Sequence, residues 1–343
     1  MYIENNQLKK YISIWLVAMF WIIALMIIVG GLTRLTDSGL SITTWELFAG
    51  FLPPLNATEW QNYFDLYKEI PEYKIQNYSM TLNEFKIIFW WEWAHRFLGR
   101  LIGISFLLPL IYFTIKLNFK KLTTLYLVFF LICFQGFLGW YMVSSGLVDR
   151  IDVSHYRLSI HLLMAFIILS LIYWNYLKLK SLNVGREVNN YLTLFFVFLI
   201  FLQIVIGAFV SGMDAGRIYN SWPLMGNNYF PDDNEISNLF NIDAFNDPSL
   251  VQFIHRNLAY LILFVYLIIF FQVYYNKLNN SKASVNVIGF LLILQIVLGI
   301  LTILNGAQIY IASMHQISSI FLVSSSIYLL FINRKNTSLQ LLD

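Results

Sequence analysis

The chain has 343 residues, of which 58% are hydrophobic and only 12% are charged, and its mean hydropathy is +0.64. A soluble core of this size does not need so much apolar surface, so the composition excludes an ordinary soluble domain and indicates a polytopic membrane protein. The net charge of +3 is small. It reflects how basic residues are divided between loops and gives no indication of nucleic-acid binding.

Long stretches without Asp, Glu, Lys or Arg predict the membrane spans. In chain order they cover residues 11–33, 122–148, 158–177, 188–213, 257–276 and 283–333. The last stretch would be roughly 77 Å long as a single helix, at 1.5 Å per residue. We therefore expect two spans there, separated at Asn305-Gly306. Residues 87–115 form a further span with a polar first third, so the prediction is an all-α fold with eight transmembrane helices.

The distribution of Lys and Arg predicts the orientation. The loops on the side of the two termini hold twelve of the 22 basic residues and three of the 19 acidic residues. The positive-inside rule places this side, and therefore both termini, in the cytoplasm. The residues counted on this side are Lys9, Lys10, Lys116, Lys120, Lys121, Lys178, Lys180, Arg186, Lys277, Lys282, Arg334, Lys335, Glu4, Glu187 and Asp343.

The second half of the chain repeats the first. Four spans per half is an even number, so both halves enter the membrane from the same side, and we expect a pseudo-two-fold axis along the membrane normal. The predicted architecture is two pseudo-symmetric four-helix bundles, formed by residues 1–180, with a long outer loop at 34–86, and by residues 181–343. The matching pairs are Gly30 with Gly207, Asp37 with Asp214, Trp45 with Trp222, Gln135 with Gln295, Gly139 with Gly299 and Gly146 with Gly306.

Two outer loops separate spans within this repeat. In the first, Trp60, Phe64 and Tyr67 recur at helical spacing, which predicts an amphipathic helix on the membrane surface. The second, roughly Asp214 to Leu250, is rich in acidic residues, and we expect it to be solvated.

Four histidines occupy matching places in the two halves. His95 and His255 each precede an arginine, and His161 and His315 belong to the last span of each half. We expect all four near the outer starts of their helices. An ionisable residue inside a span is costly and indicates function. A hydrogen-bonded structural role remains open for any single histidine, but four paired positions favour two haem sites, each with an imidazole on either side of the iron. His155 has no counterpart, and we expect it to face solvent.

Zinc is the weaker metal alternative. It usually takes more nitrogen or sulfur ligands at one point, and the chain has one cysteine, Cys133, which is expected to be a core residue. A haem also carries two propionates, which favour cations near water. The candidates at the outer boundary are Arg34, Arg96, Arg157, Arg217 and Arg256, with Arg150 nearby; a snorkelling role is the alternative for each.

Glu92 distinguishes the two halves. It lies three positions before His95 and therefore on the same helix face, whereas its counterpart is Gln252, which does not titrate. This difference favours one half as catalytic and the other as electron-carrying, although a boundary carboxylate in water is the simpler alternative. Two rivals remain: a di-haem b-type cytochrome that passes electrons from quinol, and a transporter, which more usually has spans broken at the midplane.

Four segments around the histidines have a distinctive sequence. They are Gly30-Gly31-Leu32-Thr33-Arg34-Leu35-Thr36-Asp37-Ser38-Gly39-Leu40-Ser41, Phe89-Trp90-Trp91-Glu92-Trp93-Ala94-His95-Arg96, Tyr156-Arg157-Leu158-Ser159-Ile160-His161-Leu162 and Phe253-Ile254-His255-Arg256. These segments resemble the haem A synthase family, in its mitochondrial and alphaproteobacterial branch. The resemblance covers nearly the whole chain. Another branch carries a cysteine pair in the first outer loop that this chain lacks.

The resemblance implies conversion of haem O to haem A by oxidation of a ring methyl to a formyl group, for terminal oxidases. It implies that His255 and His315 bind a resident haem b, and that His95 and His161 hold the substrate haem with Glu92 beside it as the catalytic residue. It also implies a multi-pass protein of the bacterial cytoplasmic (inner) membrane. The expected partners are the lipid bilayer, a haem O synthase and an electron donor, with a homo-oligomer left open and no nucleic acid.

Overall fold

The computed structural model describes residues 5–45, 49–148, 150–180, 182, 184–185 and 187–334. Glu4, Arg186, Lys335 and Asp343, which entered the orientation count, lie outside these residues. Eight of the described helices are long and apolar enough to cross a membrane, as the sequence predicts. They are α1 (Asn6–Leu35), α4 (Leu82–Lys116), α5 (Phe119–Gly146), α6 (His155–Lys178), α7 (Asn190–Gly212), α8 (Pro248–Tyr275), α9 (Asn279–Leu304) and α10 (Ile309–Ile332).

Local sequence signals fix the ends of several spans. Thr81 and Glu84 form a capping box that starts α4 five residues before the predicted span. Asp37 and Asp214 both adopt positive φ, at 49° and 50°, just after the ends of α1 and α7. The long charge-free stretch near the C-terminus is divided between α9 and α10, and Gly306 adopts a φ of 63° at the break. The predicted division at Asn305-Gly306 is therefore confirmed.

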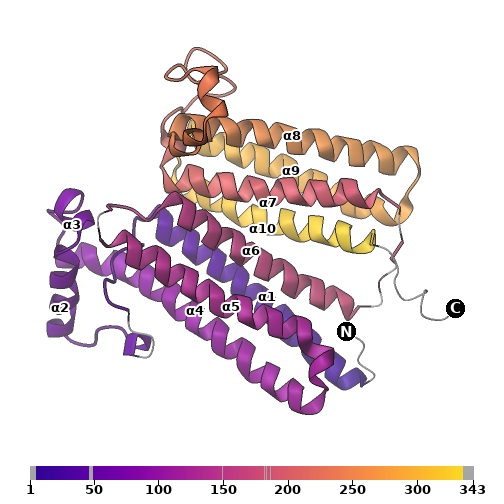
Figure 1. The fold of residues 1–343 in the computed structure, drawn as a ribbon, viewed down its shortest axis with the longest axis horizontal. Coiled ribbons are helices and arrows are strands. Elements are labelled where there is room, and N and C mark those ends of the chain that lie inside the picture. Colours follow the sequence, from indigo (N-terminus) through magenta and orange to yellow (C-terminus); the bar gives the residue numbers. More distant parts are fainter. Residues whose placement is uncertain are drawn as a thin grey trace.

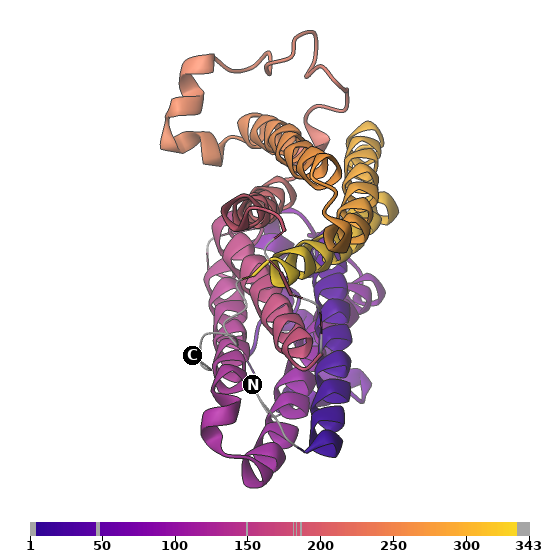
Figure 2. The same ribbon diagram turned by 90° about the vertical axis from the view of Figure 1, so that its right-hand side faces the viewer.

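The spans form two groups that lie side by side (Figure 1). In the first group α1 packs on α4 and α6, and α5 packs on α4 and α6; in the second α7 packs on α8 and α10, and α9 packs on α8 and α10. Contacts between the groups run through α1, α6, α7 and α10. Figure 2 shows this central layer from the end of the molecule. The division of the chain near residue 180 stays a prediction, which this repeated packing supports.

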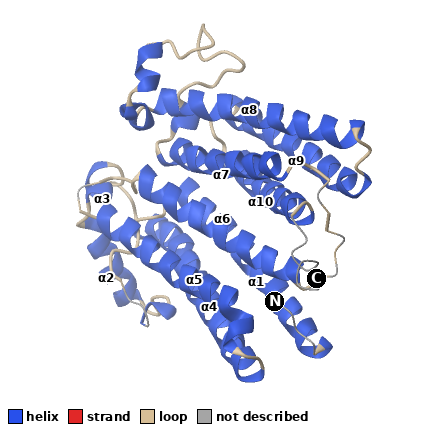
Figure 3. Ribbon diagram, turned by 45° about the vertical axis from the view of Figure 1, so that its right-hand side comes forward, coloured by secondary structure: helices blue, strands red, loops and turns tan. Residues whose placement is uncertain are grey.

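The two outer loops lie at one end of the bundle, and the start of α1 and the end of α10 lie at the other (Figures 1 and 3). The first loop contains a 3-10 turn (Ala49–Phe51) and the helices α2 (Ala57–Lys68) and α3 (Pro71–Ile75). The second contains three 3-10 turns: η2 (Ala215–Arg217), η3 (Ile236–Phe240) and η4 (Ile242–Asn246). Among the described residues there is no strand, only an isolated bridge between Met225 and Asn228.

The predicted helix in the first loop is present, but its apolar stripe faces protein. Phe64 and Tyr67 of α2 are buried, with ring centroids 5.1 and 5.2 Å from that of Phe85 on α4. The ring centroid of Trp60 on α2 lies 4.9 Å from that of Phe89 on α4. The expectation that this stripe lies on the membrane surface was therefore wrong, because periodicity cannot distinguish a lipid surface from a protein surface. The loop is instead anchored to the outer end of α4.

Candidate functional site

Each of the four paired histidines lies against a glycine of the span that precedes it. A Cβ atom added at Gly30 of α1 would lie 2.7 Å from Cε1 of His95, so close that the ring would have to shift. The same construction gives 3.0 Å from Gly139 to His161, 3.1 Å from Gly207 to His255 and 3.1 Å from Gly299 to His315. The glycines and histidines that repeat in the sequence therefore form four equivalent contacts, in which the missing side chain makes room for an imidazole.

The two histidines of the first half are close enough to bind one metal ion between them. The ring centroids of His95 and His161 are 6.4 Å apart, with an angle of 62° between the ring planes. A metal–imidazole bond of about 2.0–2.1 Å places each centroid roughly 3 Å from a shared ion. The rings belong to α4 and α6, which are diagonal in their group and are bridged by α1 and α5. His255 and His315 occupy the same diagonal positions on α8 and α10.

One ring nitrogen of each paired histidine has no hydrogen-bond partner among the described residues. Nδ1 of all four rings is buried and has no hydrogen-bond partner among the described residues. An unmade hydrogen bond on a buried group costs about 1–3 kcal/mol, so four repeated cases indicate rings arranged for something other than protein contacts. The donor set fits haem, which takes two axial imidazoles. Within the described part of the chain, no group of three or more His, Cys, Asp or Glu is arranged to hold a metal ion.

Glutamines on neighbouring helices fix the histidine backbones. The Gln135 side chain donates to the carbonyl oxygen of His161 at 3.0 Å, and Gln203 donates to that of His255 at 3.0 Å. The Gln203 amide nitrogen also lies 3.3 Å from Nε2 of His255. Gln295 accepts a hydrogen bond of 2.5 Å from Ser318, one turn after His315. These contacts orient the helix turns that carry the rings.

All four histidines were expected near the starts of their helices, and His95 is the exception. His161, His255 and His315 lie six or seven residues into α6, α8 and α10, but His95 lies thirteen residues after the start of α4. The first turns of α4 extend outward to receive the loop helix α2, on which α3 packs. His95 nonetheless contacts Gly30 near the end of α1, so it lies in the outer part of its span like the others.

Glu92 is buried and makes four contacts with hydrogen-bond donors. Its side chain is 3% exposed and forms an ion pair with Arg96, at 2.7 Å from Nη2 and 3.0 Å from Nε. The other carboxylate oxygen accepts hydrogen bonds from the Ser41 hydroxyl at 2.7 Å and the Ile42 backbone N–H at 2.8 Å. The alternative of a boundary carboxylate in water is therefore wrong. Glu92 ties the segment after α1 to α4.

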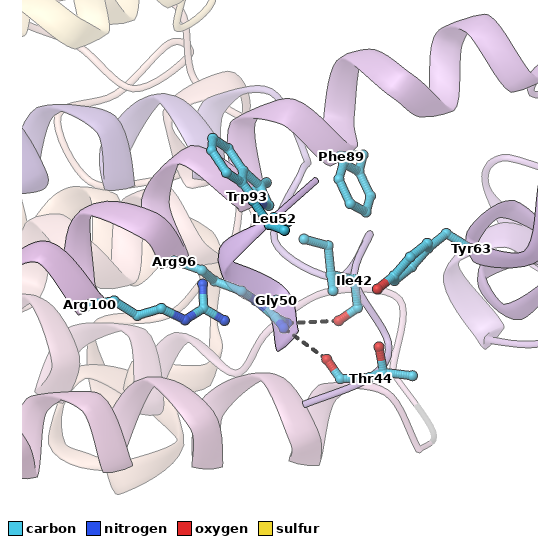
Figure 4. Close-up of a pocket in the computed structure, with 9 residues that line it drawn as sticks. All are labelled: Ile42, Thr44, Gly50, Leu52, Tyr63, Phe89, Trp93, Arg96 and Arg100. Carbon is cyan, nitrogen blue, oxygen red and sulfur yellow. Dashed lines mark hydrogen bonds between the residues drawn. The ribbon is translucent and has the colours of Figure 1, made fainter. Parts of the chain in front are cut away.

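Arg96 completes this attachment. It donates to the carbonyl oxygens of Ile42 and Thr44, at 2.7 and 2.9 Å (Figure 4). The second half repeats the arrangement without a carboxylate: Arg256 donates to the Gln252 side chain at 3.1 Å and to the carbonyl oxygens of Tyr219 and Leu224. Ile42 and Tyr219 are themselves repeat counterparts. Both arginines therefore hold an outer loop on the span that carries a histidine.

Arg34 lies between the two halves of the protein. Its guanidinium contacts Asp37 at 2.6 Å and Asp214 at 3.2 Å, and it donates to the carbonyl oxygen of Ser211 at 2.9 Å. Asp152 is 3.7 Å away. Burial raises the pKa of Asp152, and the positive charge of Arg34 opposes this rise. Three carboxylates therefore already surround Arg34.

The other outer arginines have fewer protein partners. The only ion pair of Arg217 in the described part of the chain is at 3.8 Å from Asp214, and its side chain is 54% exposed. Arg157 lies over the ring of Tyr141, with its guanidinium carbon 4.8 Å from the centroid, and precedes His161 by one helical turn. Of the five candidates, these two are the least engaged by other residues.

The expectation that His155 faces solvent was wrong. It begins α6, its ring centroid lies 5.2 Å from that of Phe209 on α7, and its Nε2 is buried without a described partner. A Cβ added at Gly212 would lie 2.8 Å from the His155 Cβ. His155 therefore contributes to packing between the halves. The sequence did not indicate this, because charged residues flank His155 in a short loop.

Two small hollows lie beside Arg96 and Arg34. The first is lined on α4 by Phe89, Trp93, Arg96 and Arg100, with Ile42, Thr44, Gly50, Leu52 and Tyr63 opposite (Figure 4). The second includes Arg34, Asp37, Asp152 and Glu72. Glu72 is 3% exposed, and burial raises its pKa to about 8. Sequence reasoning missed Glu72, because α3 has no charge pattern that separates it from a solvated loop.

Comparisons with known proteins find relatives over nearly the whole chain. A family model described as cytochrome oxidase assembly protein matches residues 13–327. A haem A synthase of Pelagibacter ubique is 50% identical over 338 residues, covering 97% of this chain and 99% of that protein. Haem A synthases of Rickettsia bellii and Maricaulis maris are 42% and 41% identical, covering 94% and 93% of this chain and 98% and 95% of their own lengths.

Proposed function

Because the chain belongs to the haem A synthase family, we propose that its two histidine pairs divide the conversion of haem O to haem A between them. In this proposal the ring methyl of haem O is oxidised to a formyl group at His95 and His161, and His255 and His315 hold a resident haem b. The observation that supports it most strongly is the fourfold contact between a glycine and a histidine, each ring with a buried Nδ1 that lacks a described partner.

The first pair would bind the substrate because Glu92 lies on the same helix, three residues before His95. A carboxylate near the reacting methyl would accept a proton or stabilise developing positive charge. Its contacts with Arg96, Ser41 and Ile42 keep it in one orientation. In the second half Gln252 occupies this place and cannot exchange a proton, which suits a site that only retains its cofactor.

The second pair would hold haem b, which supplies reversible one-electron transfer when bound. The protein would contribute the imidazoles of His255 and His315 there. Gly207 and Gly299 leave room for the rings, and Gln203 fixes the backbone of His255. The propionates of the two groups would meet the outer arginines, of which Arg157 and Arg217 have the fewest protein partners; Arg34, Arg96 and Arg256 would act mainly by holding the loops around the sites.

The eight spans and the bacterial relatives identify a multi-pass membrane protein. The excess of basic residues on the side of the two termini supports a cytoplasmic location for both, in the cytoplasmic membrane. Haem O would enter from the bilayer, supplied by a haem O synthase, and an electron donor would serve the second site. The similarity to haem A synthases over nearly the whole chain favours this function over a di-haem cytochrome that only passes electrons.

The deciding experiment is to express the chain together with a haem O synthase in a host without haem A and to separate the extracted haems by chromatography. The proposal expects haem A with the wild-type chain, haem O alone with His95→Ala or His161→Ala, and full haem A with Cys133→Ala as a matched control. Haem O alone with the wild-type chain, in membranes that contain the folded protein, would refute the proposal.

A further inference from the structure

One polar contact joins the two halves immediately beside the histidines. The Gln316 side chain of α10 donates a hydrogen bond of 2.9 Å to the carbonyl oxygen of Ile27 on α1. Its carboxamide lies directly against Gly31, one turn further along α1. A Cβ atom at position 31 would overlap this carboxamide. Gln316 therefore fits α1 only because residue 31 is glycine.

The chain neighbours of these two residues belong to the two candidate haem sites. Gln316 follows His315, whose ring lies against Gly299, and Gly31 follows Gly30, whose missing side chain makes room for His95. A continuous line of contacts thus runs from His315 through Gln316 and Gly31 to Gly30 and His95. Its one non-covalent step between the halves is the contact of Gln316 with Gly31, beside the hydrogen bond from Gln316 to Ile27, which lies 289 positions earlier in the sequence.

The repeat does not provide the same contact a second time. The counterpart of Gln316 is Leu162, which follows His161, and the counterpart of Gly31 is Ala208, which follows Gly207. Leucine has no hydrogen-bonding group, and alanine carries the Cβ atom that Gly31 lacks. The polar contact therefore belongs to one of the two equivalent junctions, so duplication of the repeat alone does not account for it.

The polar contact restrains α10 on α1 more tightly than the apolar contacts nearby. The ring centroids of Trp21 and Phe321 lie 6.4 Å apart on the same two helices, and such contacts tolerate sliding and rotation. A hydrogen bond to one carbonyl oxygen, with a side chain seated on a glycine, defines both rotation and register. Small residues allow this close approach of membrane helices.

We propose that Gln316 and Gly31 are positioning residues that set the relative placement of the two histidine pairs, so that a change on α1 alters the environment of His315. The proposal rests on the proposed function only in naming haem as the group that reports this environment. The contact itself is a property of the protein, and it can be tested without haem as the reporter.

The first test is a double-mutant cycle on the detergent-purified protein as isolated, followed by thermal unfolding. Gly31→Ala should lower the unfolding temperature markedly, because the new Cβ displaces Gln316. Gly31→Ala in a Gln316→Ala background should have a much smaller effect, because the carboxamide is absent. Gly103→Ala is the matched control, since a Cβ there meets nothing within 4 Å. Additive effects would overturn the contact.

The second test records the electron paramagnetic resonance spectrum of the low-spin haem that depends on His315. Gly31→Ala should shift its g values, although the substitution lies in the other half. Adding Gln316→Ala should return the values toward those of the wild type, and Gly103→Ala should leave them unchanged. Unshifted g values in Gly31→Ala, together with a coupled thermal cycle, would overturn the positioning role. If the wild type shows no His315-dependent haem, the proposed function fails, and the thermal cycle still decides the contact.

Discussion

Arg96 and Glu92 lie one helical turn apart on α4 and form an ion pair of 2.7 Å in which both side chains are nearly buried, at 11% and 3% exposure. The pair binds three backbone groups of the segment that follows α1, namely the Ile42 N–H and the carbonyl oxygens of Ile42 and Thr44. The residue proposed for catalysis is thus also part of the attachment between a loop and the span that carries His95.

These two roles make Glu92→Gln informative. The glutamine keeps the shape and copies Gln252, but its amide nitrogen cannot accept the hydrogen bonds that one Glu92 oxygen accepts. We therefore expect a folded protein with a lower unfolding temperature and an unchanged haem b spectrum. Haem A yield should fall about 10²–10⁴-fold, the usual contribution of acid–base assistance, with accumulation of haem O or a partly oxidised haem, measured by chromatography. Ser41→Ala, which removes one hydrogen bond and no charge, should retain most activity. Wild-type yield from Glu92→Gln would leave only the structural role.

The second histidine pair should carry the stable haem. His255→Ala and His315→Ala should each remove the low-spin b-type absorption from the purified protein, because one axial ligand cannot hold the iron in a bis-histidine state. His155→Ala is the control: it removes a partly buried imidazole at the outer end of α6 that belongs to neither pair. Full absorption in both His255→Ala and His315→Ala would show that the pair is not the ligand set.

The glycines opposite the histidines should be intolerant of a methyl group. Gly299→Ala places a Cβ at 3.1 Å from the His315 ring, and overpacking of this kind costs about 1–3 kcal/mol. We expect less bound haem per protein and a lower unfolding temperature, measured by absorption and by a thermal melt. Gly136→Ala on α5, where the added Cβ meets nothing within 4 Å, should resemble the wild type. Equal haem content in the two variants would contradict the proposed role of the contact.

Burial of Glu72 should make the first outer loop sensitive to pH. Burial raises the pKa of Glu72 from 4.5 to about 8, with the nearby charge of Glu92 as a further cause. Between these pH values Glu72 binds a proton in the folded protein and releases it in the unfolded chain. The stability that neutral Glu72 contributes is therefore fully present below pH 4.5 and is lost as the pH rises through about 8.

Limited proteolysis within residues 36–81 measures this effect directly. Cleavage of the wild type should be faster at pH 8.5 than at about pH 6 after correction for protease activity, and the difference should shrink in Glu72→Gln, which stays neutral. Glu69→Gln, an exposed neighbour on the same loop, should keep the wild-type difference. The same pH response in wild type and Glu72→Gln would exclude Glu72 as its source.

Spans and histidines could be predicted from the sequence because each leaves a local signal. A charge-free run predicts a helix such as α7, and a histidine within such a run is conspicuous. The contacts of Arg96 with Ile42 and of Gln316 with Gly31 leave no such signal, since each partner is ordinary in its own segment and they meet only after folding. The doublet Gly30-Gly31 was the one available indication, and it did not specify which helix approaches.

The surroundings of Arg34 bear on how the two halves of this chain can diverge. Arg34 and Ser211 are repeat counterparts, and the arginine donates to the backbone of its own counterpart while it contacts Asp37 and Asp214. Two identical halves could not both place a guanidinium there, because like charges would meet at the junction. Fusion into one polypeptide allows the arginine on one side only. A half-length product cut near residue 180 would keep the guanidinium and lose Asp214, so only re-association of the two halves would restore this ion pair across the junction.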